Sequence, residues 1–152
     1  MDGKNNLILL IASFALGLLM AGAVAISIFK TSDSIKISLV NSEINTIKLA
    51  AISTYLPKSS DGTFTGIANT DISASVPGLT ITGGKLVSKV NTSVTYDVTA
   101  KSGDSTQLEI ACAGLSAITN LETSVKNTQT GIATSITDTT AGDGILVLDY
   151  KG

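Results

Sequence analysis

The fold of this chain is decided by one stretch near its start, LILLIASFALGLLMAGAVAISIF, which spans residues 7–29. The stretch holds no charged residue and no proline, and as a helix its 23 residues would extend about 35 Å. That length exceeds the roughly 30 Å hydrocarbon core of a bilayer, so the sequence predicts a membrane-spanning helix. A cleavable signal peptide fits less well, because its apolar core would span only about 7–15 residues. A plain single-pass anchor is a further interpretation.

Small side chains recur every four residues along this stretch. They would form one stripe of a helix, and such stripes let helices approach closely in apolar surroundings. The plainer explanation is that Gly and Ala are common in membrane helices in general. The first predicted site is a filament-core, helix-packing surface that comprises Leu7, Leu10, Ser13, Phe14, Gly17, Ala21, Gly22 and Ala25. The segment from Gly17 to Gly22 is where the helix is expected to loosen on packing.

The pattern becomes amphipathic soon after Phe29. Apolar residues spaced by three and four predict a second site, a stripe that packs on a sheet and comprises Ile37, Val40, Ile44, Ile47 and Ala51. The other faces are expected to carry Lys36, Glu43, Asn45 and Lys48. Pro57 disfavours helical geometry in the residue before it, so the helix is predicted to end near Leu56. The chain thus divides into an apolar helix (1–30), an amphipathic helix (31–56) and a globular domain (57–152).

The globular domain is rich in Gly, Ser and Thr and contains short alternating apolar runs. Strands are predicted at 79–81, 86–90, 94–98, 108–111 and 145–150. Gly83 and Gly84 separate the first two and predict a hairpin. A short helix is predicted over Cys112–Leu121 and an irregular loop over Asp71–Pro77. The expected class is α+β: a long N-terminal helical spine with a projecting apolar half, whose amphipathic half packs on a small, mainly antiparallel sheet with one short helix.

The composition argues against several classes of function. Ser and Thr make up 38 of the 152 residues, and the chain contains neither His nor Arg. Without His there is no Ser-His-Asp triad and no imidazole metal ligand, so we expect no enzyme and no catalytic, cofactor or metal site. A net charge of −2 without Arg argues against nucleic acid as a primary partner. The lone Cys112 cannot form an intrachain disulfide and is expected to be an inert core thiol.

Three short motifs suggest local sites, each with a plainer explanation. They are Asn91-Thr92-Ser93, Ser88-Lys89, and the loop that contains Asp138, Gly142, Asp143 and Gly144. The first matches an N-glycosylation sequon, which a chain rich in Ser and Thr also produces by chance. The second suggests a Ser–Lys dyad, although such adjacency is expected among so many hydroxyl residues. The third suggests a calcium loop, with a plain polar turn as the alternative.

These features together resemble a type IV pilin, most closely the type IVb branch of thin and conjugative pili. Residues 107–115 (QLEIACAGL) are similar to that branch's strand, cysteine and short helix, and residues 145–150 to its closing strand. The resemblance implies a structural major pilin that polymerises into a helical surface pilus through its N-terminal helix. It also implies an inner-membrane pool before assembly. The implied partners are other copies of the chain, a prepilin peptidase and the pilus assembly machinery.

The chain departs from the pilin pattern in its first residues and in its cysteines. Asn5 stands where the family usually carries a glutamate, and Cys112 lacks the second cysteine of type IVb pilins. Met1 is expected to be the first residue after leader cleavage; the alternative is that Met1-Asp2-Gly3 is a short leader and Lys4 the first mature residue. Three other interpretations stay open: a single-pass membrane-anchored envelope protein with an exposed binding domain, a secretion-system pseudopilin, and an archaeal adhesion pilin.

Overall fold

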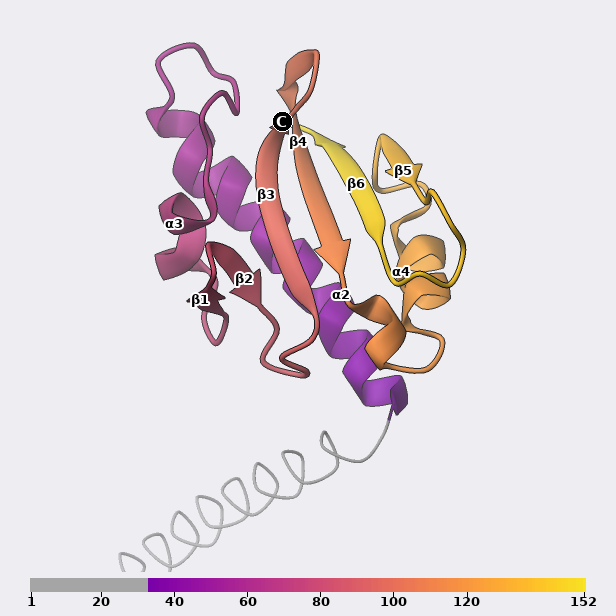
Figure 1. Cartoon of the computed structure of the whole chain (residues 1–152). Coiled ribbons are helices and arrows are strands. Elements are labelled where there is room, and N and C mark those ends of the chain that lie inside the picture. The colour runs from indigo at the N-terminus through magenta and orange to yellow at the C-terminus, as the bar shows by residue number, and fades with distance from the viewer. Residues whose placement is uncertain (1–32) are drawn as a thin grey trace, which may run out of the picture.

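The computed structural model describes residues 33–152. The predicted membrane helix, the eight helix-packing residues from Leu7 to Ala25 and the expected loosening at Gly17 lie outside the described residues. Helix α2 (Asp33–Ala50) crosses one face of a six-stranded antiparallel sheet with the order β1-β2-β3-β4-β6-β5 (Figure 1). The predicted α+β class is therefore confirmed for this part of the chain. Within residues 33–152, no helix combines the length and apolar character that a membrane crossing requires.

The helical backbone continues beyond α2 through two unusual turns. A π-helical turn spans Ala51–Tyr55, and a 3-10 turn spans Leu56–Lys58. Pro57 lies in the first positions of the 3-10 turn, where its missing N–H removes no helical hydrogen bond. The predicted end of the helix near Leu56 thus agrees with the structure to within two residues.

The sheet contains three longer strands at its centre and shorter strands at its edges. Its members are β1 (Thr80–Thr82), β2 (Lys85–Val87), β3 (Thr95–Lys101), β4 (Asp104–Ala113), β5 (Ser135–Thr137) and β6 (Leu146–Lys151). The predicted hairpin is β1–β2, and its turn residues Gly83 and Gly84 have φ values of 59° and 80°. Such left-handed angles at both positions are what a two-residue type I′ turn needs. The strand β5 was not predicted.

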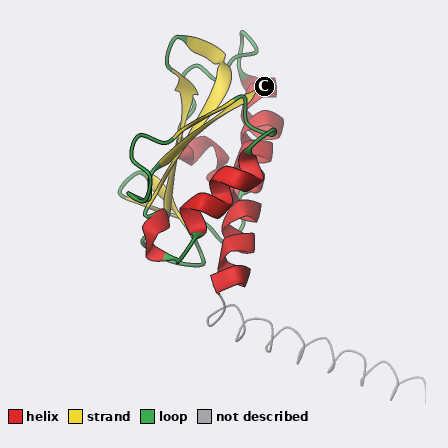
Figure 2. Ribbon diagram, turned by 90° about the vertical axis from the view of Figure 1, so that its right-hand side faces the viewer, coloured by secondary structure: helices red, strands yellow, loops and turns green. Residues whose placement is uncertain are grey.

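The domain has two layers, with the strands in one and the helices in the other (Figure 2). Helices α2 and α4 (Leu121–Gln129) lie on the same side of the sheet. The sheet residues that point toward them are buried, and they comprise Tyr96, Val98, Leu108, Ile110, Cys112, Leu146, Leu148 and Tyr150. The opposite face alternates with this set and carries mostly hydroxyl and charged side chains, including Thr95, Asp97, Thr99 and Glu109. The core therefore lies between one sheet face and the helices.

The predicted helix over Cys112–Leu121 is wrong. β4 continues to Ala113, because Cys112 pairs with Tyr96 on one side and Leu146 on the other. Gly114, with a left-handed φ of 73°, ends the strand. A 3-10 turn, Leu115–Ala117, follows, and α4 begins where the predicted helix was to end. The apolar spacing of three at 115, 118 and 121 also fits a 3-10 turn, which is why it was misleading.

The predicted irregular loop over Asp71–Pro77 is also wrong in part. The structure has a short helix α3 (Asn69–Ile72) and a 3-10 turn (Ser73–Ser75) there. The side chain of Asp71 accepts a hydrogen bond from the Ala68 backbone N–H at 2.8 Å, which satisfies a donor at the start of α3. Ile72 is fully buried, so this segment contributes to the core.

Candidate functional site

The predicted spine-to-sheet stripe lies in the core. Val40, Ile44, Ile47 and Ala51 have no exposed surface, and Ile37 packs at the margin of the same cluster. Their spacing of three and four places them on one side of the helix, which faces the sheet. The structure therefore brings all five residues together in one apolar interface.

Glu43 lies in this interface, where the sequence predicts an exposed side chain. It is 4% exposed, and its carboxylate accepts hydrogen bonds from the Tyr96 hydroxyl at 2.6 Å and the Lys89 backbone N–H at 3.2 Å. Burial, and then the Glu43 carboxylate, raise the pKa of Tyr96 far above its usual value, so the hydroxyl stays protonated. Glu43 thus links α2 to the connection between β2 and β3. The available signal was Tyr96 itself, since a buried tyrosine hydroxyl needs a partner.

A second polar cluster joins α2, β6 and α4. The Lys48 ammonium lies 5.2 Å from the centre of the Tyr150 ring, within the range of a cation–π contact. The Tyr150 hydroxyl donates to the Gln129 side-chain oxygen at 2.8 Å, and Gln129 has no exposed surface. Burial raises the pKa of Tyr150, which favours its role as a donor. The two tyrosines that face α2 are therefore both held by polar partners from the helix layer.

Asn69 holds the edge of the sheet where β2 ends. β2 pairs with β3 only at Tyr96 and Thr95, so β3 lacks a strand partner further along on that side. There the Asn69 side-chain oxygen accepts from the Val98 backbone N–H at 3.0 Å, and its amide nitrogen donates to the Gly84 carbonyl at 2.7 Å. Asn69 is 4% exposed. One side chain therefore replaces the missing strand and anchors the β1–β2 turn.

An open cavity of about 520 Å³ lies between α4 and the loop that precedes β6. Its lining includes Thr119, Asn120, Glu122, Thr123, Lys126, Asn127 and Asp138. The Lys126 ammonium lies 2.8 Å from the Asp138 carboxylate, whose side chain is only 7% exposed. The Glu122 carboxylate accepts hydrogen bonds from the backbone N–H groups of Gly142 and Gly144 at 2.7 and 2.5 Å. These contacts hold the loop against the first turns of α4.

The same contacts bear on the calcium-loop hypothesis. Asp138 is engaged by Lys126, and Asp143 accepts a hydrogen bond from the Ile145 backbone N–H at 2.8 Å. Within residues 33–152, no three acidic or cysteine side chains cluster as a metal site would require. The loop is thus organised by protein donors, as in a plain polar turn.

The Ser–Lys dyad and the lone cysteine are likewise placed by the structure. Ser88 is 3% exposed and accepts from the Val90 backbone N–H at 3.0 Å, whereas the Lys89 side chain is exposed. A buried serine engaged by backbone does not present a nucleophile to a substrate. Cys112 is fully buried, and burial raises the pKa of its thiol to about 12. It remains a protonated thiol, so the prediction of a core thiol is confirmed.

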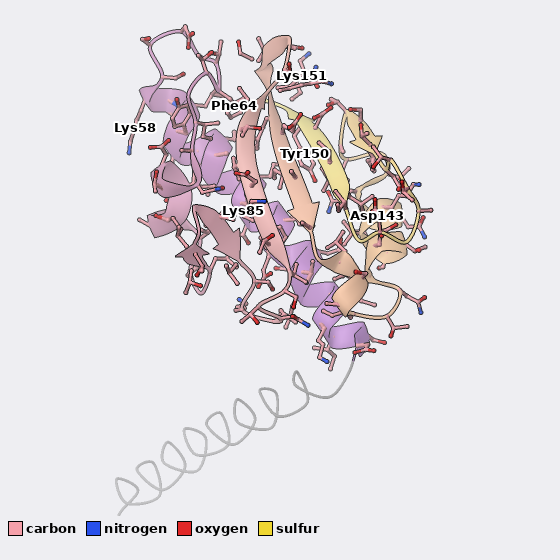
Figure 3. The ribbon with its side chains drawn as sticks, viewed as in Figure 1. Lys58, Phe64, Lys85, Asp143, Tyr150 and Lys151 are labelled. Atoms are coloured by element: carbon pink, nitrogen blue, oxygen red, sulfur yellow. The ribbon has the colours of Figure 1, made fainter. Side chains whose placement is uncertain are left out.

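Surface charges are spread thinly over the domain. Lys58 and Lys151 lie toward the end opposite the start of α2, and Asp143 lies beside α4 (Figure 3). On the open face of the sheet, the Lys101 ammonium lies 2.7 Å from the Asp149 carboxylate.

No family model, curated protein or solved structure matches this chain. The function of the chain is therefore inferred from its sequence pattern and from the contacts described above. The features that bear on it most are the buried helix–sheet interface, the end of the domain at which α2 begins, and the hydroxyl-rich open face.

Proposed function

We propose that this chain is a structural subunit of a type IVb-like surface pilus, which polymerises through its apolar segment, residues 7–29. The observation that carries the proposal is the position of Asp33, the first residue of α2. Asp33 follows the apolar segment by four residues and lies at one end of the domain, with the C-terminus at the other (Figure 1). The apolar segment therefore precedes the domain at the end away from the C-terminus.

In the proposed mechanism, the apolar segment exchanges its lipid surroundings for other copies of itself. In the bilayer, lipid covers the apolar segment, and after extraction only other copies of the segment can cover it. Burying roughly 1,500 Å² of apolar surface at about 25 cal/mol per Å² corresponds to tens of kcal/mol before ordering costs are subtracted. Because such contacts join unlike patches of successive copies, the assembly is an open helix instead of a closed ring.

The buried interface gives the polymer a rigid subunit. Tension along a filament would reach the domain through α2, whose apolar stripe and Glu43 attach it to the sheet. The open sheet face carries hydroxyl groups and charges of both signs, among which Lys101 pairs with Asp149, so neighbouring subunits would repel each other little when packed densely. Both features support a repeated structural role.

The test compares two alanine-to-leucine variants of the full chain in the organism that makes it. Ala21 belongs to the small-residue stripe, whereas Ala23, two residues later, lies on the other side of a helix. We expect Ala21→Leu to abolish filaments in negative-stain images of material sheared from cells, while Ala23→Leu retains them. Equal membrane levels of both variants would show that insertion is unaffected. Filaments from Ala21→Leu would exclude the proposed packing surface, and no filaments from the unaltered chain would exclude the pilus.

The second candidate is a single-pass membrane-anchored protein with an exposed binding domain. The cavity between α4 and the loop before β6 favours it, because its volume lies in the range of ligand sites. This candidate predicts a stable detergent-solubilised monomer that stays with the membranes after shearing. It also predicts that Ala21→Leu and Ala23→Leu behave alike.

A further inference from the structure

We propose that Asn91 is a site of N-linked glycosylation, at which the side-chain amide receives an oligosaccharide from a lipid-diphosphate-linked donor. The inference rests on one part of the proposed function, namely that residues 33–152 lie outside the membrane, where such transfer takes place. The sequon Asn91-Thr92-Ser93 supplies the sequence requirement. The structure adds that this asparagine is presented in a form that a transferase can use.

The sequon lies in the connection between β2 and β3, outside both strands. Ser88 N–H donates to the Val94 carbonyl at 2.9 Å, and Val94 N–H donates to the Asn91 carbonyl at 3.0 Å, which closes the turn. Thr92 and Ser93 are exposed, and Asn91 is partly exposed. An acceptor segment must enter a transferase as an accessible loop, so this position meets the first requirement.

The two ends of the Asn91 amide have different environments. Its oxygen accepts a hydrogen bond from the Ser93 backbone N–H at 2.9 Å. Among the residues that the structure describes, no partner occupies its nitrogen. The reacting atom is therefore free, while the hydrogen bond to the oxygen fixes the orientation of the amide. The two buried asparagines differ, since the nitrogens of Asn41 and Asn69 both donate to backbone carbonyls.

A backbone contact with Gly114 also holds the sequon in place. A Cβ atom built on Gly114 would lie 1.9 Å from the Ser93 carbonyl oxygen, so the two backbone segments are in direct contact. The backbone at Gly114 thus supports the turn, while Thr92 and Ser93 stay exposed. The exposed residues Asn120 and Asn127 of the described domain occur in Asn-Leu-Glu and Asn-Thr-Gln, which are not sequons.

The reaction balances without an oxidant or a reductant. The Asn91 nitrogen attacks the anomeric carbon of the donor sugar and forms a carbon–nitrogen bond. The bond between that carbon and the diphosphate oxygen breaks, the lipid diphosphate leaves with the electron pair, and the amide nitrogen loses one proton. The donor sits in a membrane, and the β2–β3 connection lies at the same end of the domain as Asp33 (Figure 1). With residues 7–29 in the bilayer, the sequon would face the membrane that carries the donor.

The test measures the intact mass of the full chain, purified from membranes and from sheared material of the organism that makes it. We expect an added oligosaccharide mass, with fragment ions mapping it to Asn91. Ser93→Ala should remove the added mass, because it deletes the sequon hydroxyl and keeps the backbone N–H that organises the turn. Ser93→Thr, which restores a sequon, and Asn127→Gln, which changes an exposed asparagine outside one, should both retain it.

The outcomes separate this inference from the proposed function. Filaments built from subunits of unmodified mass would overturn the glycosylation site and leave the pilus intact. Added mass at Asn91 on a chain that never forms filaments would support the site and exclude the pilus. Added mass that survives Ser93→Ala would place the modification on another residue and overturn the inference.

Discussion

The centre of the sheet and its edges are held together by different interactions. β3, β4 and β6 pair over many residues and bury apolar side chains against α2. The short strands at and next to the edges, β1, β2 and β5, have three residues each, and polar side chains fasten them. Asn69 does so at one edge, and at the other the Thr134 hydroxyl donates to Gln107 at 2.8 Å. Long strand pairing therefore holds the centre of the sheet together, whereas single hydrogen-bonding side chains hold its edges.

The largest expected effect comes from a substitution at Gly114, which directly follows the central strand β4. Gly114→Ala would force a side chain against the Ser93 carbonyl in a left-handed backbone, and we expect a loss of about 4 kcal/mol in the free energy of unfolding. Gly103→Ala is the matched control, because Gly103 also has a left-handed φ but has open space around it. It should lose only about 1 kcal/mol. Urea unfolding of the full chain in mild detergent measures both, and equal losses would show that the contact with Ser93 is unimportant.

A smaller effect is expected from breaking the edge at Asn69. Asn69→Ala leaves the Val98 N–H and the Gly84 carbonyl without their partners, so we expect a loss of about 2 kcal/mol. The neighbouring Thr70→Ala changes an exposed side chain and should be nearly neutral. Hydrogen exchange gives the sharper measurement, because the Val98 amide should exchange faster while Ile110, at the centre, keeps its protection. Loss of protection at both residues would mean that edge and centre unfold as one unit.

The smallest effect concerns pH and the buried thiol of the centre. Burial raises the pKa of Cys112 from 9.0 to about 12, so the folded chain keeps its proton where the unfolded chain loses it. Stability from this group is therefore complete below pH 9 and declines as the pH rises, by at most about 1.4 kcal/mol per pH unit. Between pH 9 and 10, Cys112→Val should show a shallower decline than the unaltered chain. If both chains lose stability with pH at the same rate, the pH dependence comes from groups other than Cys112.

The sequence predicts the elements whose pattern repeats. The apolar stripe of α2, the Gly83-Gly84 hairpin and the alternation of β3 all depend on periodic burial, and each appears in the structure. Two elements are predicted wrongly or missed because periodicity alone does not identify them. A spacing of three suits both an α-helix and a 3-10 turn, so residues 112–121 were misassigned. A strand as short as β5 has no measurable period.

The sequence pattern does not predict the polar contacts, because each contact joins residues that lie far apart in the chain. Glu43 is buried because Tyr96 and the Lys89 backbone, from a different part of the chain, supply its donors. Asn69 is buried because β2 stops short of Val98. Neither fact has a local signature, since an isolated Glu or Asn on a helix normally faces water. Only the assembled topology brings these partners together.

The π-helical turn at Ala51–Tyr55 gives the helix a point at which its frame changes. A turn that accommodates one extra residue rotates the side chains beyond it by about 100° relative to a regular continuation. Within this turn, the Thr54 hydroxyl lies 3.1 Å from the Ser75 hydroxyl, and the Tyr55 hydroxyl donates to the Thr65 carbonyl at 2.5 Å. The helix therefore makes two kinds of contact: its regular turns pack beneath the sheet, and its π-helical turn bonds to the segments that contain Thr65 and Ser75.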